Sequence, residues 1–329
     1  MPKPAFSIHH AAAEHAGRTL TTVLRQLRPG ESWSQLRRLV RNRHVQVNGN
    51  LCLDEGRKLK AGDVIKVWQE SRLPLPRAED LLIRYQDKHL VVVEKPAGVT
   101  TLRHAEERSL PRRRRQAQPT LDEMLGQVLA RSTQGRGPGT NTRRRPRAIR
   151  PVHRLDRDTS GLMVFARSPE AEQKLVQMFR KHDLHRVYLA IVAGDVPAQT
   201  FESFLVRDRG DGLRGSTRLP GVGQRAVTHV RPLESLDGYT LVQCRLETGR
   251  THQIRIHLAE AGHMVCGERI YNHPLGGRPV ADRSGAQRQA LHAAELGFAH
   301  PISGERLSFV SPLPPDLDQL LARLRGVGP

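Results

Sequence analysis

The chain has 329 residues, of which 53 are Lys or Arg and 33 are Asp or Glu, giving a net charge of +20. This charge favours polyanionic partners, either nucleic acid or an anionic membrane surface. Nucleic acid is favoured, because no apolar run is long enough to span a bilayer and no signal-peptide h-region lies near the start. Cys52, Cys244 and Cys266 form no CxxC pair, which argues against a disulfide framework or zinc knuckle and suits a reducing cytoplasm.

The first part of the chain predicts a small domain of its own. Residues 1–15 are expected to be an N-terminal tail, and residues 16–70 a compact unit of helices and short strands. Ser32-Trp33-Ser34-Gln35 has the form of a capping box and is followed by apolar residues at helical spacing. Asn48-Gly49 then follows two alternating valines, which predicts a hairpin turn.

The helix that begins at this capping box carries a basic face. Arg37, Arg38 and Arg41 fall largely away from its apolar stripe. An arginine-lined helix beside a small sheet predicts contacts with an RNA backbone. The alternative is a solvated basic helix in an accessory domain. Residues 71–77 contain two prolines and predict a short, semi-rigid linker to the next domain.

Residues 78–325 are predicted to form the second, larger domain, because longer apolar segments begin there. Val91-Val92-Val93 predicts a buried strand, after which Lys95 is either a phosphate contact or a turn residue. Residues 103–149 form a basic insertion that includes the block Arg112–Arg115. Like charges repel and stay extended until a polyanion screens them. The insertion is therefore either an arm that grips RNA or a disordered loop without a specific target, and both readings remain open.

The most informative stretch is the nine-residue run from His153 to Gly161. It places Asp156 between Arg154 and Arg157, immediately before an apolar strand at residues 162–166. Flanking cations keep a carboxylate ionised and orient it, which is a typical arrangement of a catalytic site. A structural salt bridge is one alternative. A metal-binding Asp-x-Asp pair is another, but no third acidic ligand accompanies it.

The rest of the chain mixes strands and helices. A helix is expected after Ser168-Pro169, strands at 185–192, 227–232 and 239–247, and a final helix at about 315–324. Tyr188 is an isolated aromatic residue within the first of these strands. In a helix after Thr248-Gly249, His252 and Arg255 are three residues apart and would share one face. Without regular alternation of strand and helix, an α+β class is favoured.

Several segments together resemble a known family. His-Arg-Leu-Asp followed by Thr-Ser-Gly at 153–161 is similar to the signature loop of the RluA family of RNA pseudouridine synthases. Lys-Pro-x-Gly at 95–98, Arg-x-Tyr at 186–188, the stretch from Thr248 to His257, and the segment 291–301 resemble further motifs in the family's order. Residues 44–49 resemble the hairpin of the S4 RNA-binding domain. The resemblance implies a pseudouridine synthase fold with a central mixed, largely antiparallel sheet, preceded by an S4-like domain.

The resemblance also implies roles for individual residues. Asp156 would be the central catalytic residue, either attacking the nucleotide or acting as a base on the sugar. Arg255 would pair with Asp156, holding it ionised and oriented, and Tyr188 would stack on the base or remove its C5 proton. Outside the S4-like domain, Arg154, Arg157 and Arg250 are expected to bind RNA phosphates. His252 is also expected to contact RNA. The reaction consumes no water or electrons, so no metal or cofactor is implied.

These observations predict an enzyme that isomerises specific uridines in structured RNA. Large-subunit ribosomal RNA is the preferred substrate and tRNA the second, with a monomer in the cytoplasm expected. Two other classes remain as alternatives: a non-catalytic RNA-binding ribosome-assembly factor and a metal-dependent nucleotidyl- or glycosyltransferase. The retained Asp156, Tyr188 and Arg255 argue against the first, and the missing metal-ligand spacing argues against the second.

Overall fold

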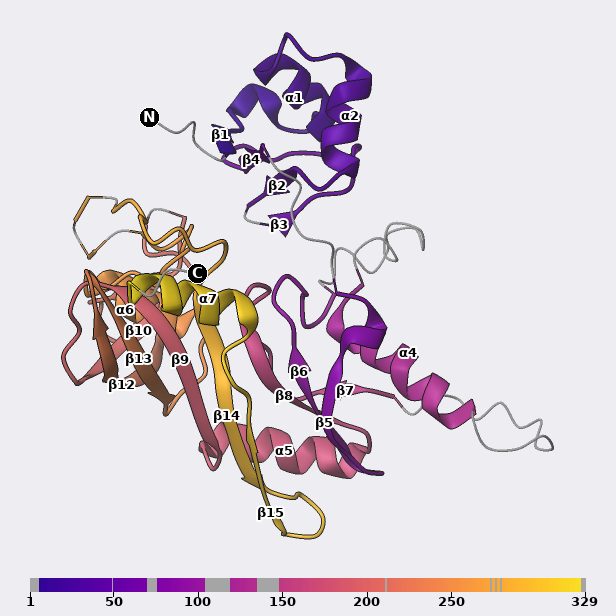
Figure 1. Cartoon of the computed structure of the whole chain (residues 1–329), viewed down its shortest axis with the longest axis vertical. Coiled ribbons are helices and arrows are strands. Elements are labelled where there is room, and N and C mark those ends of the chain that lie inside the picture. The colour runs from indigo at the N-terminus through magenta and orange to yellow at the C-terminus, as the bar shows by residue number, and fades with distance from the viewer. Residues whose placement is uncertain are drawn as a thin grey trace. The chain divides into compact units, whose positions relative to one another are not determined.

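The computed structural model describes residues 6–48, 50–69, 76–103, 119–134, 148–210, 212–272, 274–275, 277–278 and 280–326. Two compact units divide the chain: an N-terminal unit of residues 1–75 with 104–119, and a C-terminal unit of residues 76–103 with 120–329 (Figure 1). Most of the predicted linker and most of the predicted basic insertion, including Arg112–Arg115, lie outside the described residues. So does the second residue of the predicted Asn48-Gly49 turn.

The N-terminal unit packs two helices against a four-stranded antiparallel sheet. The helices are α1 (Leu20–Leu27) and α2 (Trp33–Arg41), and the strands are β1 (Phe6–His10), β2 (Val45–Val47), β3 (Asn50–Leu51) and β4 (Val64–Trp68), in the order β1-β4-β2-β3. The predicted capping box is present, since Ser32 Oγ accepts from Gln35 N at 3.3 Å and Gln35 Oε1 accepts from Ser32 N at 2.6 Å.

The expectation of a tail over residues 1–15 is wrong for residues 6–15, and residues 1–5 lie outside the described residues. Phe6–His10 form strand β1, which pairs with β4 from Phe6↔Trp68 to His10↔Val64, and a short 3-10 helix follows at Ala13–His15. The Phe6 ring lies 4.8 Å from the Trp68 ring, and Lys66 Nζ lies 3.2 Å from the centre of the Phe6 ring. These contacts attach the segment to the sheet. A five-residue edge strand has too short an apolar pattern to be recognised in the sequence alone.

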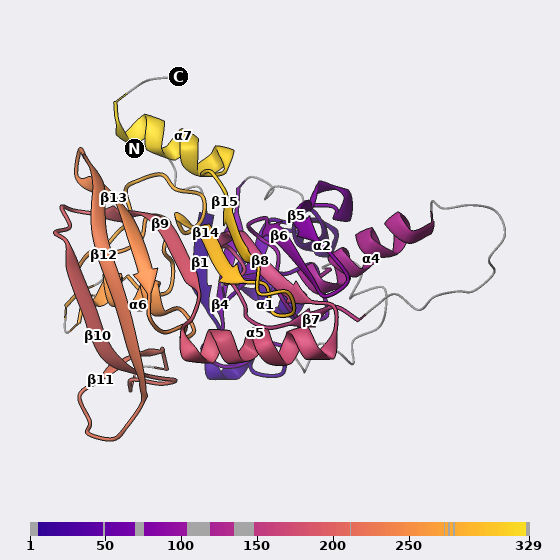
Figure 2. The same ribbon diagram turned by 90° about the horizontal axis from the view of Figure 1, so that it is seen from below.

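The C-terminal unit is built on one long sheet. Its eleven strands among the described residues are β5 (Leu82–Gln86), β6 (Leu90–Lys95), β7 (Arg150–Pro151), β8 (Ser160–Ala166), β9 (His185–Ala193), β10 (Gln199–Val206), β11 (Gly215–Thr217), β12 (Gln224–Leu236), β13 (Tyr239–Leu246), β14 (Leu291–Ala299) and β15 (Arg306–Val310). The strand order is β11-β10-β12-β13-β9-β14-β8-β6-β5, with β15 on β14 and β7 on β8, and Figure 2 shows β10 to β9 side by side. Only the β14–β8 pair is parallel, which confirms the predicted mixed, largely antiparallel sheet.

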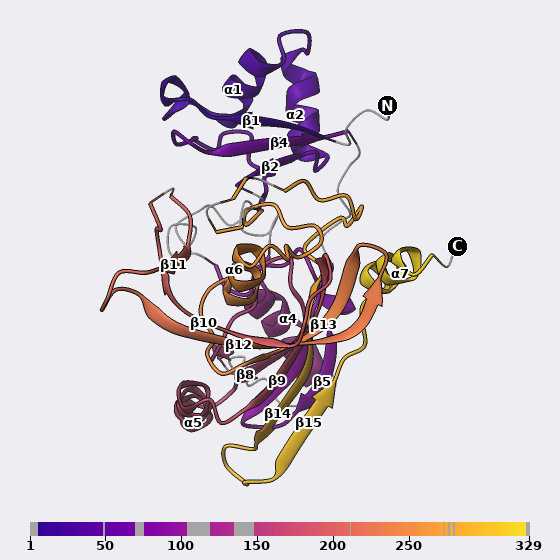
Figure 3. The ribbon, with the colours of Figure 1, turned by 90° about the vertical axis from the view of Figure 1, so that its left-hand side faces the viewer.

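Helices cover both faces of this sheet (Figure 3). Helix α5 (Pro169–Lys181) packs on one face, and α4 (Leu121–Gln134), α6 (Gln253–Glu260) and α7 (Pro315–Leu324) pack on the other. Strand β6 alternates between the two layers: Leu90 and Val92 join the α5 side, and Val91 and Val93 the opposite side. Burial on both faces explains why β6 is continuously apolar in the sequence. No helix in the described ranges is long and apolar enough to cross a membrane.

Candidate active site

The loop between β7 and β8 carries Asp156 and is fixed by buried polar groups. Lys95, at the end of β6, is 1% exposed, and its Nζ donates to the carbonyl oxygens of Pro96, Val99 and Arg157 at 3.0, 2.9 and 2.8 Å. Burial lowers the pKa of Lys95 to about 7. On the other side of Asp156, Thr101 Oγ1 donates to Leu155 O at 2.8 Å. Lys95 therefore has a structural role in this loop.

Gly161 lets this loop enter the centre of the sheet. Its φ is +113°, and an added Cβ would lie 2.2 Å from Ala293 O of the neighbouring strand β14. Only glycine tolerates both the conformation and this close approach. The preceding residues are anchored to the same region, since Gln289 Nε2 donates to Thr159 Oγ1 at 2.6 Å and Ser160 Oγ lies 2.9 Å from His292 Nδ1. The Thr-Ser-Gly part of the signature thus has a packing role.

The Asp156 carboxylate is paired with a cation from a distant segment. Arg255 Nη1, in the first turn of α6, donates to Asp156 Oδ2 at 2.9 Å. The same guanidinium makes two bonds to Glu268, with Nε to Oε2 at 2.6 Å and Nη2 to Oε1 at 2.8 Å. One guanidinium is therefore shared by two carboxylates, and its plane is fixed from behind by Glu268.

Electrostatics keep Arg255 and Glu268 ionised. Burial favours the neutral form of Glu268, but Arg255 and the backbone N–H groups of Ile270 and Arg269 outweigh it and hold the pKa of Glu268 at about 2. Burial likewise opposes the charge of Arg255, while Glu268 and then Asp156 raise its pKa above its ordinary value. The side chain of Asp156 remains 18% exposed, compared with 1% for Glu268. Asp156 can therefore reach a ligand, and Glu268 cannot.

His252 lies beside Asp156 but not within the helix. The expectation that His252 and Arg255 share a helix face is wrong, because His252 is the N-cap residue of α6, with a left-handed φ of +60°. Its Nε2 lies 3.6 Å from Asp156 Oδ1, and its Nδ1 lies 2.7 Å from the hydroxyl of Tyr271. Burial lowers the pKa of His252 to about 4, although Asp156 acts in the opposite direction. The ring is therefore neutral near pH 7.

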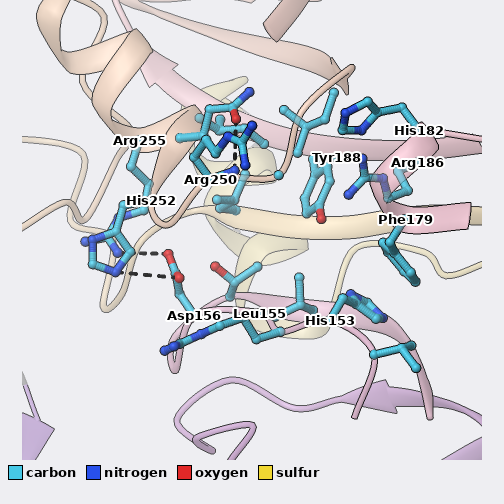
Figure 4. Close-up of a pocket in the computed structure, with 18 of the residues that line it drawn as sticks. His153, Leu155, Asp156, Phe179, His182, Arg186, Tyr188, Arg250, His252 and Arg255 are labelled. Carbon is cyan, nitrogen blue, oxygen red and sulfur yellow. Dashed lines mark hydrogen bonds and ion pairs between the residues drawn. The ribbon is translucent and has the colours of Figure 1, made fainter. Parts of the chain in front are cut away.

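Tyr188 and Asp156 line the same cavity of about 520 Å³ (Figure 4). Tyr188 points into it from β9, and Asp156 enters from the opposite loop. The Tyr188 ring is 8% exposed, and burial raises the pKa of its hydroxyl. This hydroxyl makes no hydrogen bond to any residue that the structure describes. The three residues predicted to be catalytic, Asp156, Tyr188 and Arg255, are thus brought together around one cavity.

The predicted RNA contacts fall into two groups. Arg154, Arg250 and His252 line the cavity, whereas Arg157 does not and donates from Nε to Gly98 O at 3.0 Å. In the N-terminal unit, Arg37 Nε lies 3.6 Å from Glu55 Oε2, and Arg41 bonds to the same carboxylate.

Arg38 is exposed on α2 and has no ion pair within the described part of that unit. Among the described residues, no acid balances its charge, unlike those of Arg37 and Arg41 on the same helix.

Sequence reasoning missed three residues of the site. Glu268, Tyr271 and Arg186 were not assigned roles, although Glu268 orients Arg255, Tyr271 contacts His252, and Arg186 lines the cavity. A weak signal for Glu268 exists in Gly267, which has a φ of +76°, and where an added Cβ would lie 1.9 Å from Arg288 O. A glycine next to an acid marks a tight approach of the backbone, but the sequence does not show what it approaches.

The site can carry out acid–base or nucleophilic chemistry with a single carboxylate. Asp156 is the one acidic residue that lines the cavity, facing a guanidinium held by a buried counter-ion. An aromatic hydroxyl stands across from it on β9. Such a carboxylate suits attack on, or proton abstraction from, a sugar whose base is stacked on an aromatic ring.

Comparisons with known proteins identify the family. A family model described as RNA pseudouridylate synthase matches residues 89–260, and an S4 domain model matches residues 18–65. Ribosomal large subunit pseudouridine synthase D of Xylella fastidiosa is 37% identical over 320 residues, covering 94% of this chain and 90% of that protein. The protein of the same name from Escherichia coli O157:H7 is 31% identical over 324 residues, covering 94% and 91%.

Solved structures show the same fold. Human RNA pseudouridylate synthase domain containing 4 has a TM-score of 0.57 and 25% identity, covering 75% of this chain and 95% of that one. Human RNA pseudouridylate synthase domain containing 1 has a TM-score of 0.54 and 24% identity, covering 77% and 98%. The resemblance inferred from the sequence motifs is confirmed. The chain belongs to the RluA family of RNA pseudouridylate synthases, and is an isomerase that converts uridine to pseudouridine in RNA.

Proposed function

We propose that this enzyme modifies uridines of large-subunit ribosomal RNA. Relatives from Xylella fastidiosa, Zymomonas mobilis and Escherichia coli O157:H7, each at least 31% identical, are named ribosomal large subunit pseudouridine synthase D. The S4 domain and the net charge of +20 both suit a large, structured RNA. We also propose that it works as a monomer in the cytoplasm, since one chain supplies Asp156, Arg255 and Tyr188 together.

The observation that carries the catalytic assignment is the Asp156–Arg255 ion pair at the wall of the cavity that Tyr188 also lines. Asp156 reaches C1′ or C2′ of the target ribose, and Arg255 keeps its second oxygen fixed. Tyr188 stacks on the uracil and takes up or relays the C5 proton. The uridine leaves its helix stack to enter, which costs a few kcal/mol.

Phosphate contacts offset this cost of extruding the base. Arg154 is exposed at the cavity and Arg250 is half-buried there, so both are placed to meet the backbone on either side of the target. On α2, Arg38 offers a further backbone contact. These positions determine where the RNA binds, whereas the cavity determines which base reacts.

A map of pseudouridines in total RNA tests the proposal. We expect deletion of the gene to remove one or more pseudouridines from large-subunit ribosomal RNA, and a wild-type copy to restore them. A copy with Asp156→Asn should restore none, because an amide can neither attack nor accept a proton. Asp237→Asn, an exposed turn residue between β12 and β13, is the matched control and should restore all of them.

Two other outcomes would overturn parts of the proposal. Loss of pseudouridine from tRNA alone would show that tRNA, and not ribosomal RNA, is the substrate. If the Asp156→Asn copy restored all the lost pseudouridines, Asp156 would not be a catalytic residue. Purified enzyme should also remain active in EDTA, whereas a metal-dependent transferase would lose its activity.

A further inference from the structure

Arg186 is a buried cation in the cavity of the active site that has no hydrogen-bond or ion-pair partner among the described residues. It lies on β9, is 7% exposed, and its Nε is buried with no hydrogen-bond partner. No hydrogen bond or ion pair joins its side chain to any residue that the structure describes. Burying part of a guanidinium without a hydrogen-bond acceptor or a counter-ion is costly. Such a group is retained where a ligand completes its surroundings.

The other buried arginine of the cavity shows the contrast. Arg255 is 5% exposed and is neutralised by both Asp156 and Glu268. Among the described residues that line the cavity, Asp156 is the one acid, and it is already engaged by Arg255. Arg186 therefore faces a cavity that lacks a second anion of its own. The missing negative charge has to come from the substrate.

The neighbours of Arg186 place it beside the base rather than the sugar. Residues two apart on a strand point to the same face, so Arg186 and Tyr188 enter the cavity together, as Figure 4 shows. The Phe179 ring lies 5.4 Å from the Arg186 guanidinium carbon and stacks at 4.5 Å on the ring of His153. The stacked rings of Phe179 and His153 thus lie beneath the guanidinium in the view of Figure 4. Asp156 lies at the opposite end of the cavity.

His153, which stacks beside Arg186, does not add a second charge at this position. Burial, and then Arg186 itself, lower the pKa of His153 to about 3, so this ring is neutral and its Nε2 accepts from Val164 N at 3.1 Å. At Gly249, an added Cβ would lie 3.2 Å from Arg186 Nη1, so glycine leaves the space around the guanidinium open. A planar ligand on Tyr188 can therefore reach it.

We propose that Arg186 lies against the uracil of the extruded uridine and stabilises the negative charge that the base acquires when its bond to the ribose breaks. This inference rests on the proposed function of the cavity. Cleavage of N1–C1′ leaves the electron pair on the uracil, which becomes an anion with charge on N1, O2 and O4. C1′ gains a bond to Asp156, or C2′ loses a proton to it. The base then turns and C5 bonds to C1′, while the bond from C1′ to Asp156 breaks or C2′ takes its proton back from Asp156, which restores the carboxylate. The C5 proton then leaves, and N1 takes up a proton.

The role of Arg186 is the same whichever way Asp156 acts, because both routes expel uracil as an anion. The guanidinium stays protonated throughout and moves no proton. It acts as a preorganised cation where charge develops, an arrangement that is effective in a site with little water. Arg255 cannot do this, because two carboxylates already balance its charge.

Leaving-group chemistry separates this role from a phosphate contact. The test uses an RNA fragment that carries the mapped target as uridine or as 5-fluorouridine. Fluorine withdraws electrons and makes uracil a better leaving group, so the enzyme has less charge to stabilise. We expect Arg186→Gln to slow single-turnover cleavage of uridine N1–C1′ about 100-fold. The loss with 5-fluorouridine should be at least several-fold smaller, and Kd for the RNA should stay unchanged.

Two variants serve as controls. Arg186→Lys keeps the charge and should retain part of the rate, which distinguishes charge stabilisation from packing and serves if Arg186→Gln does not fold. Arg231→Gln removes an exposed arginine of β12 that bonds to Gln243 outside the cavity, and should leave rate and Kd unchanged. The thermal unfolding midpoint of each variant is measured alongside.

Three outcomes would overturn the inference, and a fourth would overturn the proposed function. Equal losses for uridine and 5-fluorouridine, together with a weaker Kd and a reduced salt dependence, would show that Arg186 contacts a phosphate. A lysine variant as slow as the glutamine variant would show a packing role. Full activity of Arg186→Gln would show that Arg186 does not stabilise the uracil anion. Inactivity of the wild-type enzyme on RNA would overturn the proposed function instead.

Discussion

At Arg255, two carboxylates share one guanidinium in different surroundings. Glu268 takes two of its nitrogens and has a side chain that is 1% exposed, whereas Asp156 takes one and is 18% exposed. Glu268 has no access to a substrate and acts as a fixed counter-ion. Asp156 can exchange its solvent contacts for a ribose while Arg255 stays in place. The orientation of the reactive acid therefore depends on a residue that never meets the RNA.

Replacing Glu268 should affect both activity and stability. Glu268→Gln leaves Arg255 with Asp156 as its one acidic partner, so we expect the guanidinium to shift and kcat/KM to fall about 100-fold. Breaking a buried ion pair should also lower the free energy of unfolding by about 3 kcal/mol. Assays of pseudouridine formation in RNA and urea denaturation measure the two effects. An unchanged kcat/KM in a folded variant would contradict the positioning role.

The stability difference should depend on pH in a defined direction. The folded-state pKa of Glu268 is about 2, below the ordinary value of 4.5. Its ionised form therefore stabilises the folded state fully above about pH 4.5, and this contribution is lost as the pH falls towards 2. The gap in unfolding midpoint between the wild type and Glu268→Gln should be largest at neutral pH and shrink below pH 4.5. A gap that does not change with pH would contradict the ion-pair explanation.

At the scale of elements, the signature loop depends on how closely β8 approaches β14. Their parallel pairing is confined to Ser160↔His292 and Gly161↔Ala293, immediately after the catalytic loop. The loop gains its fixed position from this short contact and from the buried groups that bond to it, including Lys95 and Thr101. A change in strand spacing at this point would move Asp156 relative to Arg255.

Gly161→Ala tests this spacing. An added Cβ would lie 2.2 Å from Ala293 O, and the φ of +113° disfavours any side chain. We expect a loss of about 3 kcal/mol or more in the free energy of unfolding and a loss of activity. Gly126→Ala in α4 is the matched control, since nothing lies within 4 Å of its Cβ, and should add about 1 kcal/mol of stability. Equal effects of the two substitutions would contradict the close approach.

The arginines of helix α2 in the N-terminal unit should contribute unequally to RNA binding, because only some of them are paired with an acid. Glu55 already pairs with Arg37 and Arg41, whereas Arg38 has no acid among its described neighbours. We expect Arg38→Gln to reduce the slope of log Kd against log salt by about 0.7 to 0.9. Arg37→Gln should have a smaller effect, and Glu55→Gln should tighten binding. Titrations with a ribosomal RNA fragment at several salt concentrations would refute this order if Arg37→Gln had the larger effect.

At the scale of the whole molecule, the sequence predicted local elements better than it predicted contacts between distant segments. The capping box at Ser32, the buried strand at 91–93 and the final helix were predictable, because each depends on neighbours within about one turn or one strand. The assembly of Asp156, Tyr188 and Arg255 was predicted through family motifs rather than through spacing. The roles of Glu268 and Arg186 were not, because the first depends on which cation a buried acid meets and the second on the absence of a partner.

The place of β14 in the sheet has a consequence for how the molecule is made. Within the described sheet, β14 alone joins the block β11-β10-β12-β13-β9 to the block β8-β6-β5. Asp156 belongs to the second block, while Tyr188 and Arg255 belong to the first. A nascent polypeptide that has not yet released residues 291–299 from the ribosome can form hairpins on either side, but the acid and the arginine have no strand to align them. Synthesis through residue 299 must therefore precede any catalytic competence.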